Sequence, residues 1–106
     1  MSTSFHIIKR LIPLAAASLF AVACSTAMTK PEGADNARAR LTQLQSDPQL
    51  ASLAPVAIKE AEAAVVAAEK PQSDDDLARH LVTMANQKVD IATAQAQSKL
   101  LEDQRK

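Results

Sequence analysis

Apolar residues recur at three- and four-residue intervals through most of the chain after residue 33, and this spacing is typical of amphipathic α-helices. The pattern predicts one helix over about 35–46, a second over about 55–70 and a third over about 74–104. Alanine and other good helix formers fill most of these segments. We therefore expect an all-α fold, a small alanine-rich antiparallel bundle of three helices in which the third is long.

The apolar positions of each predicted helix fall on one face, which is expected to turn inward. In the first helix this face consists of Ala34, Ala37, Leu41 and Leu44. In the second it consists of Ala54, Ala57, Ile58, Ala61, Ala64, Val65 and Ala68, with Lys59, Glu60, Glu62, Glu69 and Lys70 on the other side. The third helix carries a narrow seam with coiled-coil-like spacing: Ala78, Val82, Ala85, Val89, Ala92, Ala96 and Leu100.

A second apolar stripe runs beside the seam of the third helix and consists of Leu77, Leu81, Met84 and Ile91. A helix with a wide apolar face usually touches two neighbours, so ordinary core packing is the plainer interpretation of this stripe. The alternative is a docking surface for another protein. Because the wide face ends near Ile91, we expect the last part of the third helix to project from the bundle.

Proline residues and capping signals separate the helices. Asp47-Pro48 and Ala54-Pro55 mark a break, and Pro55 fits the first turn of a helix, where its missing N–H costs nothing. Pro71 ends the second helix, and Ser73 is the expected N-cap of the third in a capping box with Asp76. The alternative fold is a long kinked helical hairpin, with residues 36–70 as one arm.

The first 24 residues have the order of a bacterial secretory signal and its cleavage site: Lys9-Arg10, an apolar run, and then Ala21-Val22-Ala23-Cys24. This order resembles the lipobox of bacterial lipoproteins, in which the cysteine receives a lipid and becomes the first residue. The apolar run is too short to span a bilayer, which takes ~20 residues. We therefore expect a signal peptide over 1–23, a lipidated tether over 24–34 and a helical domain over 35–106, with Cys24 as the lipidation site.

Composition removes several classes of function. Without the signal segment the chain has no aromatic residue and is slightly acidic, which argues against nucleic-acid binding. Gly33 is the only glycine, so a phosphate-binding loop is excluded. Cys24 is the only cysteine, and His80 would be the only histidine left, which is too few for a zinc site. We expect no metal, no cofactor, no small-molecule substrate and no enzymatic activity.

Three segments of the chain carry a resemblance to a known family: 54–64, from Ala-Pro-Val-Ala-Ile onward; 80–85, His-Leu-Val-Thr-Met-Ala; and 88–96. They resemble alanine-rich lipoproteins of Gram-negative bacteria that contain a helical domain of unknown function (DUF4398 type). The resemblance covers most of residues 35–105 and implies no catalytic residues. Relatives often continue into an OmpA-like domain that binds peptidoglycan, whereas this sequence stops at Lys106, so that role is not carried over.

These observations predict a non-enzymatic outer-membrane lipoprotein whose helices face the periplasm and act as a protein-interaction or spacer module. Ser25 follows the cysteine, and in lipoproteins a residue other than aspartate there implies sorting to the outer membrane. The expected partners are the membrane, through the lipid on Cys24, and an envelope protein or a second copy of the chain. The candidate contact residues are those of the second stripe: Leu77, Leu81, Met84 and Ile91.

The alternative function is an envelope staple that resembles the murein lipoproteins. Those proteins combine a lipid-bearing cysteine and alanine-rich helical seams with a terminal Arg-Lys, whose lysine joins peptidoglycan. Arg105-Lys106 matches this ending, which makes Lys106 the candidate attachment site. Murein lipoproteins are essentially one continuous helix, however, and Pro48, Pro55 and Pro71 forbid a continuous helix here.

Overall fold

A computed structural model describes residues 29–106 of the chain, and Cys24 with the predicted signal segment lies outside the described residues. Three helices follow one another: α2 (Ala34–Ser46), α3 (Pro55–Glu69) and α4 (Asp75–Arg105). The described part of the chain contains no strand. The all-α prediction is therefore confirmed.

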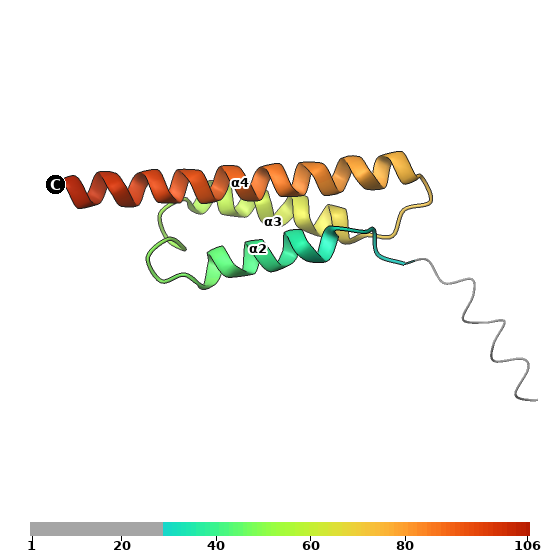
Figure 1. The fold of residues 1–106 in the computed structure, drawn as a ribbon, viewed down its shortest axis with the longest axis horizontal. Coiled ribbons are helices and arrows are strands. Elements are labelled where there is room, and N and C mark those ends of the chain that lie inside the picture. The colour runs from blue at the N-terminus through green and yellow to red at the C-terminus, as the bar shows by residue number, and fades with distance from the viewer. Residues whose placement is uncertain (1–28) are drawn as a thin grey trace, which may run out of the picture.

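The helices lie side by side with alternating direction, so that α2 and α4 run the same way and α3 runs against both (Figure 1). The alternative fold, with residues 36–70 as one kinked arm, is wrong because the chain turns back between α2 and α3 and packs the two helices together. α4 has 31 residues and is ~46 Å long, about twice the length of α3. No helix of the described residues is both long and apolar enough to cross a membrane.

The last part of α4 extends beyond the turn that joins α2 to α3, as Figure 1 shows. Its final residues, 101–106, are all exposed, whereas Ala96 is fully buried. The prediction of a projecting end is therefore confirmed.

The core consists mostly of small side chains from all three helices. Leu41, Val65 and Val89 are the largest side chains that are fully buried. All four inward positions predicted for α2 are buried, and so are all those predicted for α3 except Ala64, which is half-buried. In α4, the middle of the predicted seam is buried and its two ends are half-buried: Ala85, Val89, Ala92 and Ala96 against Ala78, Val82 and Leu100. The helical periodicity of the sequence thus places the core correctly.

Local signals explain the break between α2 and α3. The carboxylate of Asp47 accepts hydrogen bonds from the backbone N–H groups of Gln49, at 2.8 Å, and Leu50, at 3.2 Å. These bonds stabilise a series of turns over 48–53, within the break that Asp47-Pro48 and Ala54-Pro55 predicted. Pro55 is the first residue of α3, as predicted.

The N-cap of α4 is Asp74, so the prediction of Ser73 at this position is wrong by one residue. The Oδ1 atom of Asp74 accepts hydrogen bonds from the backbone N–H groups of Asp76, at 3.0 Å, and Leu77, at 3.2 Å. Serine and aspartate are both good caps, and a run of Ser-Asp-Asp-Asp offers more than one starting point for a helix. A carboxylate gives the stronger, charge-assisted bond to the free N–H groups.

Gly33 precedes α2 with a φ of 90°, a backbone conformation that favours glycine. A Cβ atom at this position would lie 3.0 Å from Cγ1 of Val82 on α4. The absence of a side chain at Gly33 therefore allows the chain to enter α2 close beside α4.

Candidate interaction surface

The residues of the second stripe of α4 differ in how far they are exposed to solvent. Leu77 and Ile91 are 41% and 46% exposed, respectively. Met84 is half-buried, and Leu81 is half-buried with its side chain packed against the core. Leu81 is therefore partly a core residue, whereas Leu77 and Ile91 contribute an apolar edge along α4.

One side of α3 continues this apolar edge. Val56, Glu60, Ala63 and Ala67 follow at three- and four-residue spacing and therefore share one side of the helix. Val56 is 71% exposed, the most of any large hydrophobic residue in the described part of the chain. Ala63 is exposed and Ala67 is half-buried.

An ion pair between α3 and α4 establishes that this side of α3 borders the stripe of α4. Nζ of Lys88 lies 3.7 Å from Oε2 of Glu60. Val56 lies one turn before Glu60 on α3, and Ile91 lies one turn after Lys88 on α4. Because the two helices are antiparallel, Val56 and Ile91 therefore lie at the same level along the bundle. We call the combined set the α3/α4 surface: Val56, Glu60, Ala63, Ala67, Leu77, Met84, Lys88 and Ile91.

The opposite side of the bundle is held by arginine side chains of α2. Arg38 donates two hydrogen bonds to the carboxylate of Glu69 on α3, at 3.0 Å and 2.6 Å. These hydrogen bonds lower the pKa of Glu69 and raise the pKa of Arg38. The sequence placed Glu69 on the outer side of α3, and the structure corrects this, since only the position of α2 reveals the pairing.

Arg40 makes the corresponding contacts to α4. It donates a hydrogen bond to Oδ1 of Asn86 at 2.9 Å and pairs with the carboxylate of Asp90. The two arginines therefore fix α2 against both other helices. Arg40 meets the side of α4 that bears Asn86 and Asp90, so the α3/α4 surface remains uncovered by α2.

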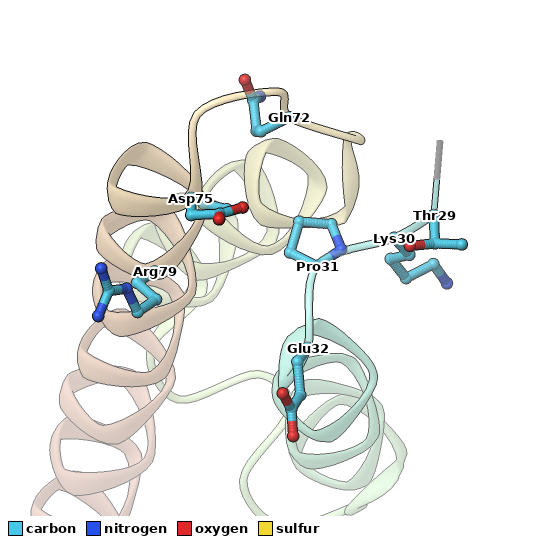
Figure 2. A pocket seen from close by; sticks show the side chains of 8 residues that line it. Thr29, Lys30, Pro31, Glu32, Gln72, Asp75 and Arg79 are labelled. Carbon is cyan, nitrogen blue, oxygen red and sulfur yellow. The ribbon is translucent and has the colours of Figure 1, made fainter. Parts of the chain in front are cut away.

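A cavity lies where the segment before α2 meets the start of α4 (Figure 2). It has a volume of about 540 Å³ and is bounded by the segment before α2, by Gln72 and by Asp75 and Arg79 of the first turns of α4. Its cations are already paired, Lys30 with Asp35 at 2.9 Å and Arg79 with Asp76. The hydrogen bond to Asp35 raises the pKa of Lys30. The open cavity therefore presents no charge pattern that selects a ligand.

The remaining candidate residues lie apart from one another. Lys106 follows the last turn of α4, where its Nζ lies 3.9 Å from Oδ1 of Asp103, and its side chain is exposed. His80 is exposed on α4. Within residues 29–106 no group of three His, Cys, Asp or Glu side chains could hold a metal ion.

Comparison with known proteins gives one match. The sequence profile of a family described as "Domain of unknown function (DUF4398)" matches residues 33–106, which contain all three helices and the whole α3/α4 surface. No curated protein and no solved structure matches the chain. The chain belongs to the DUF4398 family.

Proposed function

We propose that this chain is a lipid-anchored, non-enzymatic protein of a Gram-negative cell envelope whose helical bundle faces the periplasm and works by contact. The observation that carries the proposal is the order of basic, apolar and small residues that ends at Cys24. Lipid on this cysteine would attach the chain to the outer membrane, and Ser25 agrees with sorting to that membrane.

The arrangement of the helices supports an orientation in which the bundle stays close to the membrane and the tip of α4 reaches away from it. The segment 24–33 is short, and an extended chain covers at most ~3.5 Å per residue, so the bundle would stay within roughly 35 Å of the lipid. α2 and α4 begin at the same end of the bundle (Figure 1). The projecting tip of α4 would therefore point away from the membrane.

The α3/α4 surface supports contact rather than a passive spacer. It combines exposed apolar residues of two helices, among them Val56 and Ile91, around the pair formed by Glu60 and Lys88. Apolar patches bordered by polar groups are typical of interaction sites.

The staple function is the second candidate, and the exposure of Lys106 beyond the projecting tip of α4 favours it. The two breaks of the chain, between α2 and α3 and between α3 and α4, separate this fold from the single continuous helix of murein lipoproteins. The anchored contact module is therefore the preferred function.

Intact-mass analysis of the protein isolated from envelopes tests the proposal. We expect a chain that begins at Cys24 and carries acyl groups, and fractionation of membranes is expected to find it with the outer membrane. C24A abolishes the anchor and leaves the protein out of the outer membrane, whereas T26A, two residues away, keeps it. S25D is expected to redirect the protein to the inner membrane. A chain that retains residues 1–23, or that begins at an unmodified Cys24, contradicts the proposal.

A further inference from the structure

We propose that the α3/α4 surface binds a second copy of this chain in a parallel, two-fold symmetric dimer. A two-fold interface uses the same patch on both copies, so the patch has to complement itself in charge and in shape. The α3/α4 surface meets both conditions when the two-fold axis is parallel to the helices and lies in front of this surface, at equal distance from α3 and α4. This axis places α3 of one copy over α4 of the other.

Charge complementarity follows from the ion pair in the middle of the surface. Glu60 and Lys88 lie level with each other on α3 and α4, with 3.7 Å between their charged atoms. Rotation about the proposed axis therefore brings Glu60 of one copy opposite Lys88 of the other. Both side chains are partly exposed, 59% for Glu60 and 36% for Lys88, so each has room to accept a second partner.

Shape complementarity follows from the different residue sizes on the two helices. α4 presents the larger side chains, Leu77, Met84 and Ile91, at seven-residue intervals that suit a coiled-coil contact. α3 presents the alanines Ala63 and Ala67 on the same surface. In the proposed dimer, large side chains of α4 meet small ones of the second copy's α3, and Ile91 meets the exposed Val56.

The membrane anchor selects the parallel arrangement, and this step rests on the proposed function. An axis along the bundle keeps the beginnings of both α2 helices at the same end, so two lipidated tethers reach the same membrane. An axis across the bundle would place the two tethers at opposite ends of the dimer. Association would also add to the stability of the bundle, because its core consists mostly of small side chains and buries little apolar area.

Sedimentation equilibrium of the purified full-length lipoprotein in density-matched detergent tests the proposal. We expect the mass of two chains for the wild-type protein and a dissociation constant at least tenfold higher for I91D, because a buried aspartate without a partner opposes association. L101D is the matched control. Leu101 is also an exposed large hydrophobic residue of α4, 60% exposed, but it lies on the projecting tip, ten residues beyond Ile91 and away from α3. A single chain at every concentration, a larger assembly, or equal effects of I91D and L101D would overturn the inference.

A charge-exchange experiment separates contact between copies from contact within one copy. E60K gives this face two positive charges and K88E gives it two negative charges, so each variant alone is expected to weaken the dimer about tenfold or more. A mixture of the two variants restores attraction at both cross-contacts, although the pair within each chain remains broken. We expect the mixture to form dimers as tightly as the wild-type protein. Failure of the mixture to recover would show that Glu60 and Lys88 act only within one chain.

The outcomes for this inference and for the proposed function are distinct. A lipidated protein that sediments as one chain keeps the envelope function and removes the dimer. A dimer formed by a protein without lipid keeps the α3/α4 contact and removes the anchor, together with its argument for a parallel arrangement.

Discussion

Two stripes of α4 lie side by side, and the buried one carries the smaller residues. Ala85, Val89, Ala92 and Ala96 are at most 1% exposed. In the neighbouring stripe Leu77 and Ile91 are more than 40% exposed. Small side chains let two helix backbones approach closely, whereas large side chains remove more apolar area from water. We therefore interpret close approach of the backbones, and not the area that each residue buries, as the factor that selects the face of α4 that meets α3.

Because the seam of α4 consists of small residues, it buries little apolar area. The helix α2 contributes additional buried apolar area to the core. Leu41 is fully buried, with a relative exposure of 0%, and Leu44 is 4% exposed. Both lie on the shortest of the three helices. The long contact between α3 and α4 thus sets the geometry, and the short helix α2 adds large apolar side chains and two arginine contacts.

The largest effect is expected where the bundle depends on a large side chain. L41A is expected to lower the free energy of unfolding by about 2–5 kcal/mol, because it removes a fully buried leucine and leaves a cavity. L101A, at a leucine that is 60% exposed on the projecting tip, is expected to change it by less than about 0.5 kcal/mol. Urea unfolding followed by circular dichroism measures both. Equal effects of the two substitutions would show that α2 does not complete the core.

The opposite substitution tests the seam. A92L adds volume where the side chain is fully buried, which forces α4 away from its neighbours and is expected to cost about 1–3 kcal/mol. A94L makes the same change two residues away at an exposed position and is expected to have little effect. The same urea titration compares them. A stabilised A92L variant would mean that the helices have room to spare and that close approach is not what selects this face.

The sequence predicted the helices and the inward stripes well, since both follow from periodicity within one segment. Leu41 and Ala92 were placed in the core on spacing alone, and the proline signals located the breaks. The N-cap of α4 was misplaced by one residue, because Ser73 and Asp74 satisfy the same local rule. The pairing of Arg38 with Glu69 was missed, since residues 31 positions apart meet only after the helices have packed.

The sequence also could not show which residues of the second stripe of α4 are exposed and which pack against the core. Leu77, Leu81, Met84 and Ile91 share one face of the helix and have similar apolar character, so a periodicity pattern treats them as one set. Which of them faces the core depends on where α3 lies and how α4 is rotated against it. The candidate contact role of this stripe stays a prediction, and Cys24 lies outside the described residues.

Alanine substitutions along this stripe sharpen the comparison between the two faces of α4. L81A is expected to cost about 1–2 kcal/mol, because Leu81 is half-buried and packs against the core. I91A is expected to cost less than about 1 kcal/mol at low protein concentration, where single chains dominate, yet to weaken association. Urea unfolding and sedimentation of the same variants separate stability from association. Equal losses of stability for both would identify the whole stripe as core.

The smallest effect concerns the ion pair that fixes α2 to α3. The hydrogen bonds from Arg38 hold the pKa of Glu69 below its ordinary value of 4.5. A carboxylate whose pKa is lower in the folded state stabilises the fold above its unfolded-state pKa, and that stabilisation is lost as the pH falls through the folded-state value. Because both side chains are partly exposed, 35% for Arg38 and 23% for Glu69, the contribution is expected to be about 1 kcal/mol or less.

E69Q isolates this contribution. The variant is expected to be slightly less stable than the wild-type protein at pH 7, and the difference should shrink as the pH falls below about 4.5, where the wild-type carboxylate gains its proton. E102Q is the control, since Glu102 lies on the projecting tip and only approaches Lys99 at 3.8 Å. Urea unfolding at a series of pH values gives the three curves. If E69Q and the wild-type protein lose stability in parallel on acidification, the charge of Glu69 does not stabilise the fold, and the contact of Arg38 with Glu69 only positions α2 against α3.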